Sequence, residues 1–445
     1  MRLGTCIFKA RALFLALVLL SSVVLLSLVI IVRAESERPI QSFGVIQTSP
    51  LAQSLKLGAY GASSSYFYDL TADQIASSYD MSQSLYAGAN APTDPYVVKM
   101  TRVKTLNPVY KALIYRNVLC FYRSYTDEWN TAMNNGWLLK DASGNYIVTA
   151  GGENYMADTT NQNCHQWLAN MLKSQLDWYP DIWDGTMLDN CLVVSASQWE
   201  AIGGGQAIKP GTNRRFTDAE VLTGYSQLIN AVIAALGPSK LVLPNGIWNG
   251  YMFYNNPGYS TILNGVPQLN ALGSESTFYE MNGVRYYTEA EWKNSIDMIV
   301  WVQDNFLNGH PERRFSTYCN VVDGPLPSGT TQEQMMLFGY CSAMLAIKNN
   351  QNSIGFGFDL GKSPTVLTLA QRLRNIDMGE PSGNYYKIAD TSVYARDFSG
   401  GKVLVNPTDA SYTVTLDKSY VRFDGNVVSG SLTLISHGGT ILLNS

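Results

Sequence analysis

The stretch Trp183-Asp184-Gly185-Thr186-Met187-Leu188-Asp189-Asn190 decides the fold, because it is a short apolar run that ends in a carboxylate. In a (β/α)8 barrel the strand interiors are apolar, whereas the last residue of each strand emerges at the carboxyl-terminal end, where substrates bind. Asp189 holds that last position. Asp184 lies an odd number of positions away and therefore points to the other face of the strand. We predict that Asp189 is a site residue and that Asp184 braces the opposite end of the barrel.

Between about residues 55 and 360, short apolar runs alternate with segments whose apolar residues recur every three or four positions. This alternation is typical of a parallel sheet with crossover helices. The predicted strands are Leu57–Tyr60, Ser84–Tyr86, Lys111–Tyr115, Thr186–Asp189, Leu241–Pro244, Leu269–Gly273, Phe315–Cys319 and Ser353–Asp359. The clearest helices are Cys164–Trp178, Asp218–Leu236, Glu289–Phe306 and Gln332–Lys348, two of which follow capping-box sequences at Thr217 and Thr288. We predict one (β/α)8 barrel over residues 55–380, with a doubly wound open sheet as the alternative.

The pattern changes towards the C-terminus. Short β-rich segments separated by Gly, Asn, Pro or Asp begin near residue 385 and continue to the end of the chain. Such spacing is typical of a small antiparallel domain. We therefore predict a β-sandwich-like domain over residues 381–445, which serves packing rather than chemistry.

The N-terminus has the features of a targeting segment. Arg2, Lys9 and Arg11 precede an uncharged apolar run from Ala12 to Val32. The run is close to the roughly 20 residues that span a bilayer and longer than most signal-peptide cores. Residues 1–34 are therefore predicted to be either a cleaved signal peptide or an uncleaved signal-anchor, with 35–54 as a spacer. In both cases the remainder lies outside the cytoplasm, secreted or held at the cell surface by one membrane segment.

The composition favours a carbohydrate partner over a nucleic acid. The 445 residues carry a net charge of −4, which gives no basic field to hold phosphates. Only 15% of the residues are charged, whereas the chain has 27 Tyr and 9 Trp. Aromatic rings stack on the C–H faces of sugars, while Asn, Ser and Tyr bind hydroxyl groups. The alternative is that most of these rings belong to the core or to ordinary surface.

The cysteines and histidines indicate no metal site. Three histidines are scattered far apart and no CxxC pair occurs, so we predict neither a metal nor another cofactor. Beyond the N-terminal run the five cysteines are Cys120, Cys164, Cys191, Cys319 and Cys341. A bridge between Cys120 and Cys191 and a set of buried free thiols are equally compatible with this pattern.

Hydrolysis of a glycosidic bond requires two carboxyl groups, one to protonate the leaving oxygen and one to act as nucleophile or base. Glu275 is the best partner for Asp189, because the run that begins at Leu269 ends in it. We expect Glu275 to be the buried group with a raised pKa and Asp189 to be solvated and ionised. Glu280 replaces Glu275 if the strand ends later. The alternative for both acids is a structural role in loops or helix caps.

Further polar and aromatic residues near predicted strand ends are typical of a sugar subsite. Asp158 precedes a predicted helix, so helix capping is its alternative role. Asp359 closes the last predicted strand, where capping is equally compatible. The predicted substrate-binding residues are Asp158, Asn190, Asn245, Trp248, Tyr60, Tyr122 and Asp359.

Several of these motifs, in this order, resemble a known family. They are Gly136-Trp137-Leu138-Leu139-Lys140-Asp141, Met156-Ala157-Asp158-Thr159-Thr160-Asn161 and the run from Trp183 to Asn190. The chain is similar to glycoside hydrolase-like family fifteen and to the wider group of α-galactosidase-type and polygalactosaminidase-type barrels. The resemblance implies that Asp189 is the nucleophile or base and Glu275 the proton donor.

We therefore interpret the chain as an extracytoplasmic glycoside hydrolase that acts on a polysaccharide or another glycan. The alternative is a catalytically inactive barrel that binds a surface glycan or a protein. A Ser-His-Asp hydrolase is disfavoured, because no Gly-x-Ser-x-Gly elbow occurs.

Overall fold

The structure is a computed structural model that describes residues 55–60, 70–149, 153–280, 285–321, 326–327, 329–348, 350–358 and 364–445. The predicted targeting segment, the spacer and Asp359 lie outside these residues. The chain divides into two compact units. The smaller one contains residues 120–157 and 200–215, and the larger one contains residues 53–119, 158–199 and 216–445.

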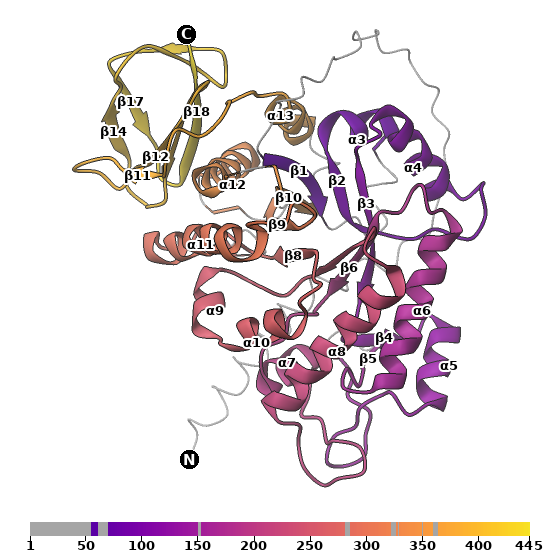
Figure 1. The fold of residues 1–445 in the computed structure, drawn as a ribbon. Coiled ribbons are helices and arrows are strands. Elements are labelled where there is room, and N and C mark those ends of the chain that lie inside the picture. Colours follow the sequence, from indigo (N-terminus) through magenta and orange to yellow (C-terminus); the bar gives the residue numbers. More distant parts are fainter. Residues whose placement is uncertain are drawn as a thin grey trace, which may run out of the picture. The chain divides into compact units, whose positions relative to one another are not determined.

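An eight-stranded parallel sheet is the centre of the larger unit (Figure 1). Its strands are β1 (Leu55–Tyr60), β2 (Met81–Leu85), β3 (Lys111–Asn117), β6 (Gly185–Asp189), β7 (Leu241–Pro244), β8 (Ala271–Ser274), β9 (Arg314–Val321) and β10 (Asn352–Phe358). The order is β7-β6-β3-β2-β1-β10-β9-β8, so the first strand pairs with the last. A parallel bridge between Ile247 and Ser274 links the segment after β7 to β8.

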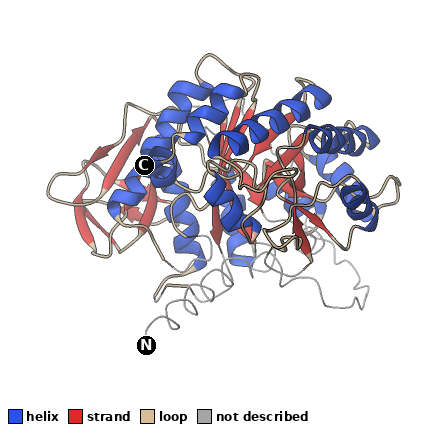
Figure 2. Ribbon diagram, turned by 90° about the horizontal axis from the view of Figure 1, so that it is seen from below, coloured by secondary structure: helices blue, strands red, loops and turns tan. Residues whose placement is uncertain are grey.

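Helices follow the strands along the chain and flank them (Figure 2). They are α3 (Ala72–Ser78), α4 (Pro95–Leu106), α6 (Gln162–Trp178), α7 (Ala196–Gly203), α8 (Asp218–Leu236), α9 (Gly250–Asn255), α10 (Gly258–Gly265), α11 (Glu289–Val302), the π-helix η1 (Gln303–Leu307), α12 (Gln332–Ala346) and α13 (Pro364–Arg374). The larger unit is thus a mixed α/β structure. The smaller unit contains the pair β4 (Cys120–Tyr122) and β5 (Asn154–Met156) and the helix α5 (Thr126–Asn134).

Within the described ranges, α8 is the one helix that is long and apolar enough to cross a membrane. It packs against α6 and α10 and buries Val221, Leu228 and Val232, which is typical of a core helix.

Each predicted strand of the sheet overlaps an observed one, and both predicted capping boxes are present. The largest error is at β2, which begins at Met81, three residues before the predicted start. Its side chains at Ser82 and Gln83 are fully buried but polar, so the apolar pattern did not reveal this part of the strand.

Asp184 fixes the amino-terminal end of β6, as its position in the sequence predicts. Its carboxylate accepts hydrogen bonds from Lys104 Nζ at 2.5 Å, Lys111 Nζ at 3.0 Å and the backbone N–H of Ala112 at 2.8 Å. The two ion pairs therefore join the start of β6 to β3 and α4, at the end of the strand opposite to Asp189.

Gly185 is required by the close approach of β6 to β7. A Cβ atom built there would lie 2.0 Å from the carbonyl oxygen of Leu241. We expect Gly185→Ala to lower the free energy of unfolding by about 3 kcal/mol, because the two strands would have to separate. The control is Gly339→Ala in α12, where the added atom meets only side chains, those of Cys319 at 3.3 Å and Phe356 at 3.6 Å. Urea titration measures both, and equal effects would contradict the prediction.

The predicted antiparallel region at the C-terminus is confirmed. A six-stranded sheet has the order β11-β12-β13-β18-β15-β16, and β14 pairs with β17 in a second sheet. The strands are β11 (Tyr386–Lys387), β12 (Tyr394–Phe398), β13 (Gly401–Asn406), β14 (Tyr412–Thr415), β15 (Tyr420–Arg422), β16 (Val427–Val428), β17 (Ser431–Leu434) and β18 (Gly438–Asn444). Side chains from both sheets form one apolar cluster, which includes Val393, Leu404, Val414, Leu434 and Leu442. We call residues 385–445 the β-domain.

A buried arginine joins the β-domain to α12. Arg396 on β12 donates from Nη1 to the backbone oxygens of Met344 at 3.2 Å, Leu345 at 3.0 Å and Ile347. These carbonyl groups lie at the C-terminal end of α12, where a helix has no partners of its own for them. Burial lowers the pKa of the guanidinium to about 10, and the side chain stays charged at neutral pH.

All five described cysteines are buried free thiols, so the alternative of a bridge between Cys120 and Cys191 is wrong. Burial raises the pKa of Cys164 to about 12 and also raises those of Cys191, Cys319 and Cys341.

Candidate functional site

Asp189 is the last residue of β6 and is half-buried among polar groups from three strand ends. The hydroxyl of Tyr115, on the neighbouring strand β3, donates to Oδ2 at 2.7 Å. The amide of Asn245, which follows β7, donates to Oδ1 at 3.1 Å. The amide of Asn190 donates to Oδ2 at a longer 3.3 Å. Each oxygen of the carboxylate is therefore held in a defined direction.

Glu275 lies beside Asp189, because one amide bridges the two acids. It directly follows β8, its side chain is 7% exposed, and its backbone N–H donates to the carbonyl oxygen of Ile247. The fully buried Asn245 donates from Nδ2 both to Glu275 Oε2 at 2.8 Å and to Asp189 Oδ1 at 3.1 Å. Because these two distances share the Nδ2 atom, the two carboxylate oxygens are at most about 5.9 Å apart, the sum of 2.8 Å and 3.1 Å.

The backbone is unusual immediately after both acids. Only four described non-glycine residues have positive φ, and two of them are Asn190 at 53° and Ser276 at 54°. L-residues adopt this conformation only when the surroundings stabilise it, and such residues concentrate at functional sites. The chain therefore turns sharply after Asp189 and again after Glu275.

The exposure of the two acids follows the expected order, but the pKa of Asp189 differs from the prediction. Glu275 is buried and Asp189 is the more exposed of the pair. Burial nevertheless raises the pKa of Asp189 above its usual value, against the opposing hydrogen bonds from Tyr115 and Asn245. The expectation of a freely solvated Asp189 is thus wrong, because the ends of the neighbouring strands surround its carboxylate.

Tyr318 on β9 is a further group beside the acids. Its side chain is fully buried, and burial together with the negative charge of Glu275 raises the pKa of its phenol. The phenol thus remains protonated over the whole range in which the carboxyl groups titrate. It was not selected from the sequence, where Tyr318 is an aromatic residue inside a predicted strand. A possible clue was Ser316, a polar residue on the same face of that strand.

The other acids considered from the sequence do not join this pair. Glu280 forms an ion pair with Arg285 at 2.9 Å, and its side chain is half exposed. Asp158 is buried and accepts from the backbone N–H of Thr160 at 3.0 Å and from its hydroxyl at 2.6 Å. Asp158 does not cap α6, since the N-cap is Asn161.

The remaining predicted contacts are distributed over several places. Asn190 and Asn245 lie at Asp189, and Trp248 is half-buried between β7 and α9. Tyr60 ends β1, but its side chain lies outside the described part of the structure. Tyr122 is on β4 in the smaller unit, so its contact with sugar stays a prediction. Among the described residues, no group of three His, Cys, Asp or Glu side chains could hold a metal ion.

Asp189 at the end of β6 and Glu275 directly after β8 are thus bridged by the amide of Asn245, which follows β7, the strand between them. The chain belongs to the hypothetical glycosyl hydrolase family 15, whose model matches residues 104–402, more than half of the sequence. This confirms the resemblance found in the sequence motifs.

Several of the solved structures to which the whole chain is similar are glycosidases. A noncanonic maltogenic α-amylase from Thermotoga neapolitana is 11% identical, with a TM-score of 0.49, covering 88% of this chain and 99% of that one. A sulfoquinovosidase from E. rectale is also 11% identical, with a TM-score of 0.49 and coverages of 88% and 62%. A dextranase from Flavobacterium johnsoniae is 10% identical, with a TM-score of 0.47, and the chain spans about half its length, with coverages of 88% and 51%. No curated protein matches the sequence.

Proposed function

We propose that this protein is a retaining glycoside hydrolase whose catalytic residues are Asp189 and Glu275. The observation that carries the proposal is the bridge from Asn245 to both carboxylates. Retaining enzymes hold their two carboxyl groups roughly 5–5.5 Å apart, whereas inverting enzymes leave about 6.5–9.5 Å for a water molecule. The upper limit of about 5.9 Å between the two bridged oxygens lies below the inverting range.

The parallel sheet is best interpreted as a closed (β/α)8 barrel. β1 pairs with β10, and β7 and β8 are the two outermost strands of the order. The parallel bridge from Ile247, which follows β7, to Ser274 on β8 links these two outermost strands. One buried cluster takes side chains from six strands, as expected for a filled barrel interior. Its members are Met81, Leu113, Met187, Leu243, Ala271 and Tyr318. Asp189 and Glu275 then lie at the carboxyl-terminal end, where barrel enzymes have their sites.

The roles proposed for the two acids are those that the family resemblance implies. Asp189 attacks the anomeric carbon, and the bond from that carbon to the leaving oxygen breaks as the Asp189 ester forms. Glu275 gives its proton to the leaving oxygen. In the second step Glu275 takes a proton from water, whose oxygen replaces Asp189 at the same carbon. The donors Tyr115 and Asn245 hold Asp189 in line and stabilise its charge when it leaves.

The substrate in this proposal is an extracellular polysaccharide or glycan, and no metal takes part. The support is the low charge, the richness in Tyr and Trp, and the apolar N-terminal run, which directs the chain out of the cytoplasm as a secreted or membrane-anchored protein. Half-buried Trp248, in the loop after β7, is the proposed stacking surface for a sugar ring.

The test uses the full-length chain, purified in detergent, on a panel of α- and β-linked polysaccharides and aryl glycosides. We expect hydrolysis of at least one, and proton NMR of the first product should give the anomeric configuration of the substrate. A product of opposite configuration would exclude Asp189 as nucleophile. Binding without any cleavage would support the alternative of an inactive glycan-binding protein.

A further inference from the structure

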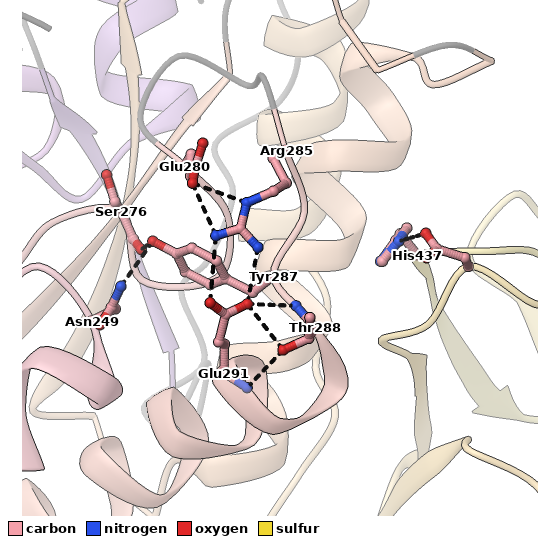
Figure 3. A network of polar contacts seen from close by, with 9 residues as sticks. Asn249, Ser276, Glu280, Arg285, Tyr287, Thr288, Glu291 and His437 are labelled. Atoms are coloured by element: carbon pink, nitrogen blue, oxygen red, sulfur yellow. Dashed lines mark hydrogen bonds and ion pairs between the residues drawn. The ribbon is translucent and has the colours of Figure 1, made fainter. Parts of the chain in front are cut away.

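The hydroxyl of Tyr287 links the segment that follows Glu275 to the loop after β7. Tyr287 donates its hydroxyl to the backbone oxygen of Ser276 at 2.8 Å, and Asn249 Nδ2 donates to the same hydroxyl at 3.1 Å (Figure 3). Ser276 has the positive φ described above and is the next residue after Glu275. The hydroxyl of Tyr287 therefore stabilises the strained peptide that sets the direction of Glu275.

An ionic network fixes the segment that carries Tyr287, directly before α11. Arg285 bonds to Glu280 at 2.9 Å and to Glu291 at 3.0 Å, and Glu291 also completes the capping box of α11 with Thr288 (Figure 3). Backbone N–H of Glu280 donates to the carbonyl oxygen of Arg285 at 3.0 Å. These bonds link Glu280 and Arg285 to the first turn of α11. The chain is therefore held in place on both sides of Tyr287.

The β-domain supplies a second support. The imidazole of His437 stacks on the ring of Tyr286, with a centroid distance of 4.2 Å and an interplanar angle of 3°. His437 is 7% exposed, and its Nε2 lies 2.9 Å from Asp409 Oδ1. Gln334 on α12 donates to the backbone oxygen of His437 at 3.3 Å. The β-domain thus contacts the residue adjacent to Tyr287.

We propose that Tyr287 is a positioning residue for the proton donor Glu275, and that the β-domain stabilises it through His437 and Tyr286. This inference rests on the proposed function and deepens it. It gives the β-domain a part in catalysis that does not require the β-domain to bind sugar. The hydroxyl of Tyr287 touches no reacting atom, and its effect passes through the peptide of Ser276.

The choice of leaving group distinguishes a loss of proton donation by Glu275 from a general loss of active-site structure. A dinitrophenolate leaves without a proton, whereas a methyl glycoside needs Glu275 to donate one. We expect Tyr287→Phe to lower kcat/KM on the methyl glycoside about 10- to 100-fold, as a small misplacement of a catalytic group does. On the dinitrophenyl glycoside of the same sugar the loss should stay below about 3-fold. Equal losses on both substrates would overturn the proposal.

Tyr385→Phe is the matched control. Its hydroxyl donates to Asp297 Oδ1 on α11 at 2.8 Å, so the variant also removes one hydroxyl hydrogen bond that reaches α11. It leaves the contacts of Ser276 and Tyr287 intact, and both substrates should be cleaved at the parent rate. His437→Phe should retain the stacking and the parent rates, while His437→Ala should reproduce the leaving-group pattern of Tyr287→Phe. The same rates in His437→Ala as in the parent would exclude the β-domain from this role.

The support that Tyr287 and His437 give to the segment after Glu275 is called the brace below. Hydrogen exchange tests this brace independently of catalysis. In the full chain, the backbone amides of residues 276–280 should exchange at least about 10-fold faster in Tyr287→Phe and in His437→Ala than in the parent, because their local opening costs less free energy. Tyr385→Phe should leave them unchanged. If the parent hydrolyses no glycoside but these amides exchange faster, the proposed function fails and the brace stands. Unchanged exchange in both variants overturns the brace, whatever the activity.

Discussion

Replacing Asp189 by asparagine is expected to lower kcat by about 10⁴-fold on any glycoside that the parent cleaves, a loss typical of removing a nucleophile. Asparagine has nearly the same shape and still accepts the hydrogen bond from Tyr115, so the loss reports the charge and nucleophilicity of the carboxylate. Single-turnover hydrolysis of a dinitrophenyl glycoside measures it. A variant that keeps more than a tenth of the parent rate would remove Asp189 from the mechanism.

The same variant should unfold at a higher, not a lower, urea concentration at neutral pH. Burial raises the pKa of Asp189 in the folded state above its value in the unfolded chain. Ionised Asp189 therefore costs stability above its unfolded pKa, and the parent regains that stability as pH falls through the folded pKa. The advantage of Asp189→Asn should thus be present at pH 7 and vanish below about pH 4. Loss of activity together with gained stability separates a functional role from a structural one.

The second large effect is expected for Asn245→Asp, which keeps the shape of the side chain but replaces the bridging amide by a third carboxyl group. Asn245 is fully buried and donates to both acids. An aspartate at position 245 has no positively charged partner in that bridge and is repelled by Asp189 and Glu275. We therefore expect the free energy of unfolding to fall by about 3–5 kcal/mol at pH 7. Burial and like charges raise the pKa of the new acid. The penalty should therefore be small near pH 4 and grow as pH rises.

Urea unfolding at pH 4.5 and 7.5 measures this difference. The control is Asn161→Asp, which changes the same amide at the N-cap of α6, where aspartate is an equally good cap. Its unfolding free energy should remain within about 0.5 kcal/mol of the parent at both pH values. A pH-independent loss in Asn245→Asp would show that the two acids do not face this side chain.

The sequence predicted the parallel sheet because each strand is a local property of the chain. The runs Met187–Leu188 and Leu241–Pro244 are apolar without alternation, as strands buried on both faces are. Capping residues Thr217 and Thr288 are equally local signals, and both helices begin where these residues predict. Position at a strand end is also the local signal by which Asp189 and Glu275 were chosen as candidates.

The relations between strands could not be predicted from the sequence. Asn245 was selected as a sugar contact, but its role as a bridge depends on the register that brings β7 between β6 and β8. Tyr318 is 129 positions from Asp189 along the chain, and no periodicity links them. The smaller unit, which interrupts the larger one twice, was also missed, because β4 and β5 have only three residues each.

The buried thiols give this protein built-in reporters of its own opening. An alkylating reagent can modify a buried thiol only after the surrounding structure has opened. Cys120 belongs to the smaller unit, whereas Cys164, Cys191, Cys319 and Cys341 belong to the larger one. Mass spectrometry of alkylated peptides therefore follows the opening of each unit separately, in a single sample and without any introduced label.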